Sequence, residues 1–266
     1  MSTFEQVPGL LVQIAVGSFD VWGVNANQDI FRFDGQVFRE IPGKLTQIAV
    51  GGGHLGQGDG IWGINASNEI FRFNPNTQLF DTQIPGSLAQ IVVGGLDGSV
   101  WGINASNEIF RFNPNTQLFD TQIPGSLVQI AAGSASDAWG INESNEPFAF
   151  NPNAQLFERI PGFLVQIADG WGVNASNEIF RFNPNTRLFE QIAPGSLMKI
   201  FTSPGGFDAW GINASNEIFR FNRNTQLFDI QIPGFLVQIA IGLGTGVWGI
   251  NASNEIFRFN ESVIIH

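Results

Sequence analysis

Tryptophan, asparagine and arginine recur together along this chain at a constant spacing. Asn104 lies three residues after Trp101 and Arg111 lies ten residues after it, and five other segments repeat this arrangement. A tryptophan ring offers apolar surface, whereas asparagine and arginine offer hydrogen-bonding groups. Such a set suits a small ligand that has both CH surface and hydroxyl groups, for example a pyranose. The predicted ligand-binding residues are Trp22, Asn25, Arg32, Trp62, Asn65, Arg72, Trp101, Asn104, Arg111, Trp171, Asn174, Arg181, Trp210, Asn213, Arg220, Trp248, Asn251 and Arg258.

The same sequence offers little for catalysis. It contains two histidines, His54 in a glycine-rich segment and His266 at the end of the chain, and no cysteine. A histidine-based triad or a His/Cys metal cluster needs more such residues. Aspartates recur just before the tryptophans, a pattern that indicates turn residues rather than a calcium loop. We therefore expect a protein that is not an enzyme and that needs no metal or cofactor.

Charge and composition exclude several classes of partner. Lysine and arginine total 12 against 23 aspartates and glutamates, which gives a net charge of −11. Binding to phosphate backbones or anionic membranes takes clustered lysine and arginine, so we expect neither nucleic-acid binding nor membrane insertion. The start of the chain lacks a basic segment followed by an uninterrupted apolar run. We therefore expect no secretion signal and a cytoplasmic location, so that release from the cell would need a non-classical route.

The elements that position these side chains follow from seven Trp-Gly pairs. The tryptophans stand at positions 22, 62, 101, 139, 171, 210 and 248, so the repeat is close to 38 residues in most units. Each unit holds four short apolar runs separated by Gly, Pro and Asn turns, without helical periodicity. Radially repeated four-strand units are typical of β-propellers. The sequence predicts an all-β fold, a seven-bladed β-propeller of four-stranded antiparallel blades.

The two ends of the chain predict how the ring closes. Residues 3–9 match the fourth strand of a unit and its Pro-Gly pair, whereas the last unit reaches only a third strand at 256–259. The N-terminal strand is therefore expected to complete the last blade, which removes the exposed edges of that sheet. Residues 1–266 then form a single domain. The tail at 262–266 could pair beside the N-terminal strand or reach a neighbouring subunit, so homo-oligomerisation stays open.

The recurring residues resemble the tectonin repeat. In the first unit the pattern reads PGLLVQIAVG over 8–17, VWGVN over 21–25 and IFRFD over 30–34, and it returns in register along the chain. Tectonin proteins are β-propellers, and several, from mushrooms, horseshoe crab and fish eggs, are lectins. The resemblance to the fungal members implies a multivalent lectin of innate defence that binds glycans of bacteria or nematodes. The implied ligands include O-methylated sugars, such as methylated mannose and fucose.

A hypothesis for the ligand site follows from pairing the second strand of a unit with the third. In a simple hairpin, Trp62 lies opposite Phe73 and Gly63 lies opposite Arg72, and opposed residues share a face. An aromatic face of one blade would then meet a Gly-Arg-Asn face of the next, with glycans in the inter-blade clefts. Other interpretations stay open: the tryptophans form the core, the arginines pair with carboxylates, and the Asn side chains shape turns. The Asn-Pro-Asn-Thr turns are expected on the face opposite the Asn-Ala-Ser-Asn turns, with a structural role.

The copies differ, and the fourth differs most. There Ala149 replaces the arginine, and Pro147 removes a backbone donor from the same strand. We therefore expect up to six binding clefts. An alternative function is a non-enzymatic propeller scaffold that binds a protein partner on one face. Repeated small clefts favour glycans, whereas a single composite protein-binding surface would vary from blade to blade.

Overall fold

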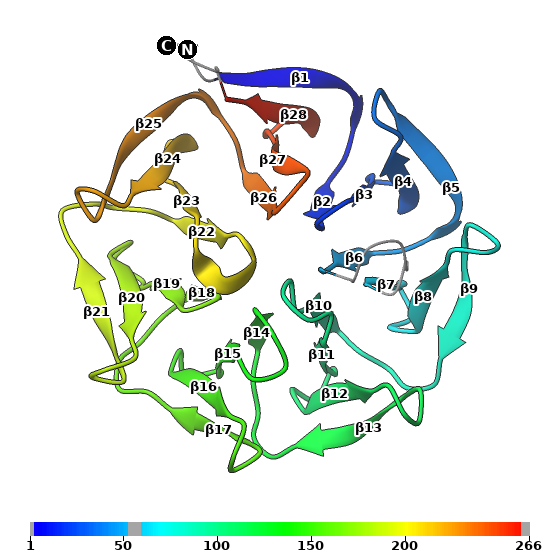
Figure 1. The fold of residues 1–266 in the computed structure, drawn as a ribbon, viewed down its shortest axis with the longest axis horizontal. Coiled ribbons are helices and arrows are strands. Elements are labelled where there is room, and N and C mark those ends of the chain that lie inside the picture. The colour runs from blue at the N-terminus through cyan, green and yellow to red at the C-terminus, as the bar shows by residue number, and fades with distance from the viewer. Residues whose placement is uncertain (1–2, 53–59, 262–266) are drawn as a thin grey trace.

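Seven antiparallel sheets of four strands surround a common centre (Figure 1). The structure is a computed structural model that describes residues 3–52 and 60–261. The predicted seven-bladed β-propeller is confirmed. Besides the strands, the described residues form one short 3-10 helix, η1 (Pro204–Gly206). His54 and the tail at 262–266 lie outside the described residues.

Each blade runs from an inner strand at the centre of the ring to an outer strand at its rim. The inner strands are β2 (Gln13–Val16), β6 (Gln47–Val50), β10 (Gln90–Val93), β14 (Gln129–Ala132), β18 (Gln166–Ala168), β22 (Lys199–Thr202) and β26 (Gln238–Gly242). The second strands are β3 (Val21–Val24), β7 (Ile61–Ile64), β11 (Val100–Ile103), β15 (Ala138–Ile141), β19 (Trp171–Val173), β23 (Ala209–Ile212) and β27 (Gly246–Ile250). The third strands are β4 (Asp29–Phe33), β8 (Ile70–Asn74), β12 (Ile109–Asn113), β16 (Pro147–Asn151), β20 (Ile179–Asn183), β24 (Glu217–Asn222) and β28 (Glu255–Asn260). The outer strands are β5 (Phe38–Lys44), β9 (Leu79–Ile84), β13 (Leu118–Ile123), β17 (Leu156–Arg159), β21 (Leu188–Ile192), β25 (Leu227–Phe235) and β1 (Thr3–Leu10).

The N-terminal strand closes the ring, as predicted. Blade 1 consists of β2 to β5, blades 2 to 6 follow in chain order, and blade 7 combines β26, β27 and β28 with β1. Strand β1 pairs antiparallel with β28, so that Phe4 lies opposite Phe259 and Gln6 opposite Phe257. Both ends of the described chain therefore share one sheet, and its third strand gains a hydrogen-bonded neighbour instead of an open edge.

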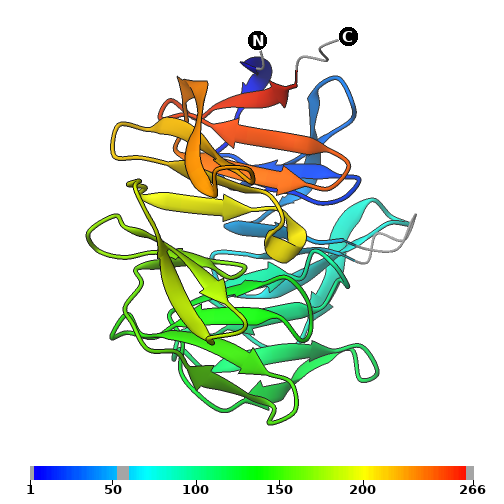
Figure 2. The same cartoon turned by 60° about the vertical axis from the view of Figure 1, so that its left-hand side comes forward.

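The loops and turns lie on two faces of the ring, one at each end of the strands (Figure 2). The loop face carries the loops between first and second strands, such as 94–99, and the turns between third and fourth strands, such as 113–117. The Pro-Gly face carries the turns between second and third strands, such as 104–108, and the connections between blades, such as 124–128. The Asn-Pro-Asn turns therefore lie opposite the Asn-Ala-Ser-Asn turns, as predicted.

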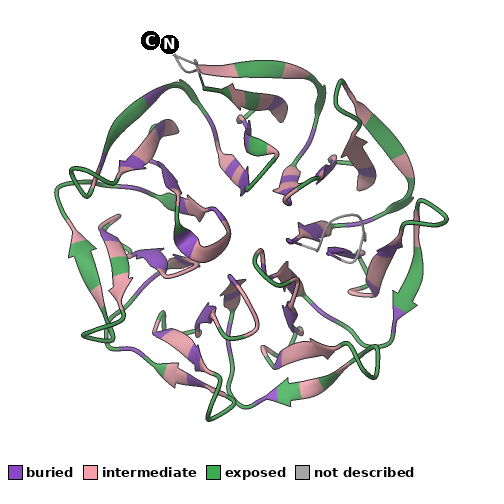
Figure 3. Ribbon diagram, in the orientation of Figure 1, coloured by how far each residue is buried: buried purple, intermediate pink, exposed green. Residues whose placement is uncertain are grey.

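The tryptophans hold adjacent blades together. The ring of Trp62 lies 4.7 Å from that of Phe112 and 6.0 Å from that of Phe119, both on blade 3 and both in edge-to-face geometry. Every tryptophan makes the same two contacts with the next blade, and blade 7 returns to blade 1 through Trp248. All seven are buried, as are the second strands on which they lie (Figure 3). Edge-to-face pairs add about 0.5–1.5 kcal/mol each beyond the area they bury, so these contacts dominate the junctions.

The glycine after each tryptophan makes room for a leucine of its own blade. A Cβ atom on Gly102 would lie 2.4 Å from Cδ1 of Leu88, a residue that is 1% exposed. The same contact recurs in all seven blades, between Gly23 and Leu11, Gly63 and Leu45, Gly140 and Leu127, Gly172 and Leu164, Gly211 and Leu197, and Gly249 and Leu236. The space beside this glycine is therefore filled by leucine and not by the arginine that the simple hairpin places opposite it.

The pairing of second and third strands differs by one residue from the predicted hairpin. Trp62 lies opposite Arg72, and Gly63 lies opposite Phe71. The connecting turn spans five residues rather than four, because the Asn65 N–H donates to the Glu69 carbonyl (3.1 Å) and Asn68 adopts φ +61°. A shift of one residue exchanges the faces of a strand. The tryptophan and arginine therefore share one face of the blade, and the Phe pair that receives the neighbouring tryptophan lies on the other.

Glutamines of the inner strands connect the blades near the axis. The Gln47 side chain donates to the Ile91 carbonyl (3.2 Å) and accepts from the Ile91 N–H (3.0 Å) of the next blade. Glutamines of blades 1, 3, 4, 5 and 7 also bond the next inner strand. Blade 6 has Lys199 at this position, which donates to the Val237 carbonyl instead (3.0 Å). These bonds explain why Gln-Ile recurs in the repeat, since they satisfy backbone groups that face the neighbouring blade.

We expect Gly102→Ala to lower the free energy of unfolding by about 1–3 kcal/mol, because the new methyl group overpacks against Leu88. Denaturant unfolding monitored by tryptophan fluorescence measures the change. The variant Leu88→Ala alone should also destabilise, by about 2–5 kcal/mol. The double variant should be less destabilised than the sum of the two, since the smaller side chain removes the clash. Strict additivity would contradict the assigned contact.

Candidate functional site

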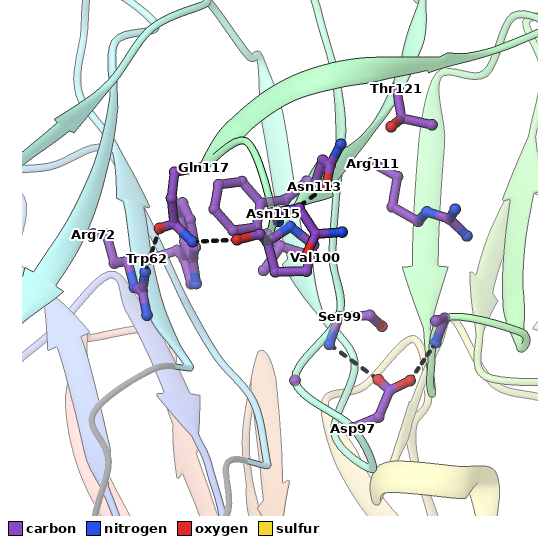
Figure 4. Close-up of a pocket in the computed structure, with 14 residues that line it drawn as sticks. Trp62, Arg72, Asp97, Ser99, Val100, Arg111, Asn113, Asn115, Gln117 and Thr121 are labelled. Atoms are coloured by element: carbon purple, nitrogen blue, oxygen red, sulfur yellow. Dashed lines mark hydrogen bonds between the residues drawn. The ribbon is translucent and has the colours of Figure 1, made fainter.

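Two equivalent clefts open between adjacent blades on the loop face. The cleft between blades 2 and 3 has a volume of about 700 Å³, and Trp62, Arg72 and Arg111 line it (Figure 4). The cleft between blades 7 and 1 has a volume of about 760 Å³, and Trp248 and Arg258 occupy the places of Trp62 and Arg72. Both volumes lie in the range of small-molecule sites. The structure thus brings the predicted tryptophans and arginines together at the junctions.

Each arginine of the repeat lies over the tryptophan of its own blade. The guanidinium carbon of Arg72 is 5.5 Å from the centre of the Trp62 ring, and the six such pairs span 4.9 to 5.5 Å. This contact follows directly from the observed register, because opposed residues share a face. Attraction between a cation and an aromatic face is worth about 0.5–2 kcal/mol. The tryptophan ring therefore orients the guanidinium group at the mouth of the cleft.

Three arginines donate to a glutamine of the next blade. Arg72 donates to Oε1 of Gln117 (3.1 Å), a residue of the turn after β12 (Figure 4). Arg32 and Arg111 make the same bond to the equivalent glutamines, over 3.1 and 3.4 Å. In each case the glutamine belongs to the turn between the third and fourth strands of the following blade. Each of these guanidinium groups thus connects two adjacent blades.

The arginines differ in whether a carboxylate neutralises them. Arg32 pairs with Asp20 (2.6 Å), and Arg220 pairs with Asp208 (3.2 Å) and with Glu261 (2.7 Å). The alternative that arginines pair with nearby carboxylates is therefore correct for these two. Within the described residues, no carboxylate partner is recorded for Arg111, Arg181 or Arg258. Arg181 and Arg258 are exposed, whereas Arg111 is half-buried and donates to Gln155.

The cleft between blades 7 and 1 also contains a strongly acidic carboxyl group. The Val37 N–H, followed by the Arg39 side chain and the Gln36 N–H, holds the pKa of Asp34 at about 2. Asp34 is therefore ionised at any physiological pH. Phe19 lies on the rim of the same cleft with 63% of its surface exposed. The cleft combines charged groups with an exposed aromatic ring, a mixture suited to an amphipathic ligand.

The predicted asparagines lie on the other face of the ring, in the turns between second and third strands. Oδ1 of Asn104 accepts from the Ser106 and Glu108 N–H groups (2.9 Å each), and its amide donates to the Glu108 carboxylate (2.6 Å). The other five make equivalent bonds: Asn25, Asn65, Asn174, Asn213 and Asn251. None of them lines the two clefts described above. Their contact with a ligand stays a prediction.

Residues that the sequence reasoning assigned to structural turns line the clefts instead. Asn113, Asn115 and Gln117, from the Asn-Pro-Asn-Thr-Gln turn of blade 3, border the cleft with Arg111. Their backbone bonds still shape the turn, since Oδ1 of Asn113 accepts from the Asn115 N–H (3.0 Å). The sequence signal that these residues border the cleft was their position, since the turn begins two residues after the arginine. This signal could be used only with the correct register between the second and third strands.

Groupings typical of other site types are not found in the described part of the chain. No three or more His, Cys, Asp or Glu side chains are placed to hold a metal ion among residues 3–52 and 60–261. Over the same ranges, no helix is long and apolar enough to cross a membrane.

Comparison with known proteins supports the repeat and the fold. A family model described as the tectonin domain matches residues 10–170 and 157–264. Among solved structures, one titled "YCF48 bound to D1 peptide" superposes with a TM-score of 0.68 and 13% identity, covering 98% of this chain and 95% of that one. Another, "Structure of U3-55K", has a TM-score of 0.71 and 8% identity, covering 97% and 98%. At such identities these structures share the fold alone. No curated protein matches the chain significantly.

We expect Asn104→Ala to lower the free energy of unfolding by about 1–3 kcal/mol, because two backbone N–H groups lose their acceptor. Urea unfolding measures the loss. Asn76→Ala is the matched control, since no hydrogen bond of the Asn76 side chain is recorded within the described residues. The control should leave the unfolding midpoint unchanged. Equal midpoints for both variants would refute the turn role of Asn104.

Proposed function

The chain belongs to the tectonin family, and we propose that it is a multivalent carbohydrate-binding protein whose inter-blade clefts bind surface glycans. The observation that carries this proposal is the repeated Trp-Arg pair at the mouth of clefts of about 700 Å³. A cleft of that size accommodates a small sugar. A binding role without catalysis agrees with a site that repeats the same few polar groups around the ring.

The geometry supports a division of labour between the two residues of each pair. Trp101 is fully buried, so its main role is to pack between blades and to hold Arg111 over its ring. The guanidinium edge presents N–H donors that can bond vicinal hydroxyl or ring oxygens of a pyranose. The aromatic and proline surfaces of the cleft, such as Phe112 and Pro114, suit the CH face of a sugar or an added methyl ether. O-methylated mannose and fucose are therefore the ligands to test first.

Repetition around the ring supports binding to surfaces with many glycans. Individual sites of this kind are shallow and open to water, so each is expected to be weak. Several sites on one rigid ring raise the apparent affinity for a glycan-covered surface, because the second and later contacts form at high effective concentration. Agglutination would then need no oligomer. A role in innate defence against bacteria or nematodes is the biological setting we propose for this activity.

A protein-binding scaffold is the second candidate function. Phe163 and Phe235 are about two-thirds exposed on the Pro-Gly face, far from the Trp-Arg pairs at the other end of the strands. Exposed aromatic residues on a propeller face are consistent with a protein partner. This candidate differs from the glycan proposal in the face it uses, so the two can be separated by variants on either face.

We expect a glycan array with the purified chain to show binding to methylated mannose or fucose above their unmethylated forms, because the methyl ether adds apolar surface. Variants that replace Phe235 with Ser should bind the array as the wild type does. Absence of binding to every glycan would favour the scaffold instead.

We also expect Arg111→Ala to reduce the number of sugars bound per chain without unfolding it, because this arginine lines one cleft and holds the turn of blade 4. Isothermal titration with the sugar identified on the array gives the stoichiometry. Arg159→Ala is the control, since Arg159 pairs with Glu146 on the Pro-Gly face (2.7 Å). Unchanged stoichiometry and affinity for Arg111→Ala would argue against the cleft.

A further inference from the structure

Blade 4 keeps the tryptophan of the repeat but not the cation that lies over it. Ala149 lies opposite Trp139, where the six other blades have arginine. Within the described residues, Trp139 is the one tryptophan without a recorded cation–π contact. Its side chain is also the most exposed of the seven, at 7% against 0–2% for the others. A small part of this tryptophan is thus exposed in the one blade that has alanine in place of the arginine.

Blade 4 retains the aspartate that pairs with the arginine in two other blades. In blades 1 and 6, an aspartate two residues before the tryptophan pairs with the arginine of the same blade, as Asp208 does with Arg220. Asp137 stands at that position in blade 4. Its Oδ1 accepts from Nε1 of Trp139 over 2.8 Å, as Asp208 accepts from Trp210 over 3.1 Å. The carboxylate therefore has the orientation that binds a guanidinium group in blade 6.

A second carboxyl group lies against the first. Asp169, in the short turn between β18 and β19, shares a hydrogen bond with Asp137 and accepts from the Gly205 and Gly206 N–H groups of η1. Gly133 makes room for it, since a Cβ there would lie 2.7 Å from the Asp169 carboxylate. Burial, and then the charge of Asp137, raise the pKa of Asp169 to about 7. Asp137 thus meets a second carboxyl group, whereas the equivalent aspartates of blades 1 and 6 meet a cation.

The arginine of the neighbouring blade that could take the place of the missing one already pairs with another carboxylate. Blade 5 carries Arg187 where the other turns have glutamine, and Arg187 pairs with Glu158 over 2.7 Å. Glu158 lies opposite Ala149 on β17 and also accepts from the Asn151 amide (2.7 Å). Arg187 therefore neutralises Glu158, and the pair formed by Asp137 and Asp169 keeps its excess of negative charge.

We propose that the junction of blades 4 and 5 binds a cationic group, a primary ammonium or a guanidinium, against the face of Trp139 and the carboxylate of Asp137. The ligand supplies the charge that Arg32 and Arg220 supply in blades 1 and 6, where the equivalent tryptophan and aspartate already hold a cation. A free amino sugar and a lysine or arginine side chain of a peptide both carry such a group. This site is independent of glycan binding in the other clefts, because it uses none of their arginines.

Binding should tighten as the pH rises. A bound cation favours the ionised state of Asp169, so its arrival releases the proton of that carboxyl group. The charged groups on the surrounding elements begin with Asp137 on the loop before β15, Asp169, and the pair of Glu158 and Arg187. On the preceding blade, Asp97 accepts from the Ala135 N–H of the same loop (2.8 Å). On the blade beyond lie Arg181 over Trp171 and Asp208 paired with Arg220. Of these, Asp169 changes charge between pH 5.5 and pH 8.

Indole NMR signals of the protein provide the test, since seven tryptophans give one Nε1–H signal each and Trp139→Phe identifies that of Trp139. Nα-acetyl-lysine amide stays charged over this pH range. It should shift the Trp139 signal, with an affinity at least about tenfold higher at pH 8 than at pH 5.5, because the pKa of Asp169 lies between. Glucosamine, tested at a pH at which its amine is protonated, should also shift the signal if the site accepts sugar-borne amines, and N-acetylglucosamine, which has no charge, should not.

Two variants decide whether the named residues form the site. Ala149→Arg restores the guanidinium group of the repeat and should abolish the shift, whereas Ala149→Ser should retain it. Asp137→Asn should weaken binding at least about tenfold, the loss expected when a charge-assisted contact is removed. Asp120→Asn removes an equal charge from an outer strand and should bind as the wild type does. A wild-type chain without a Trp139 shift, or equal losses in Asp137→Asn and Asp120→Asn, would overturn the proposal.

Discussion

The structure depends on one contact that is made seven times, the insertion of a tryptophan between two phenylalanines of the next blade. A single four-stranded blade cannot bury both of its faces, so each blade needs a neighbour on either side. The Trp62 contact with Phe112 and Phe119 shows how the two faces match, with one large ring received by two smaller ones. Because Trp248 makes the same contact with blade 1, no blade is left with an uncovered face.

The same contact explains why the clefts lie where they do. The tryptophan itself is buried in the junction between two blades. The charged group beside it is the arginine that lies opposite to it on the third strand. Arg72 lies over Trp62 and reaches Gln117 of the next blade, so the group that closes the junction on the loop face is polar and accessible. Packing in the interior thus places a hydrogen-bonding group at the same point of successive junctions, which is the arrangement that a multivalent protein needs.

The copies differ in single side chains, while the packing between the blades stays the same. Replacement of an arginine by Ala149 leaves Trp139 packed against Phe182 and Phe189, so the junction of blades 4 and 5 is kept. What changes is the charge around the ring, where Asp137 now meets another carboxyl group. A repeat protein can therefore change the charged groups of one junction without loss of the fold, because the aromatic contacts between the blades do not depend on those groups.

The sequence alone determined the number of blades, their four strands and the closure by the N-terminal strand, because a pattern repeated seven times fixes turns and apolar runs locally. It also predicted that Trp101 and Arg111 bind a ligand, but placed them on opposite faces of the blade, whereas the structure pairs them on one face. Only the tertiary structure decided which face each residue occupies, since a five-residue turn at Asn104 shifts the pairing by one position and exchanges the faces. The pairing of Asp137 with Asp169 likewise needed the structure, because these residues belong to adjacent blades and meet only when blades 4 and 5 pack against each other.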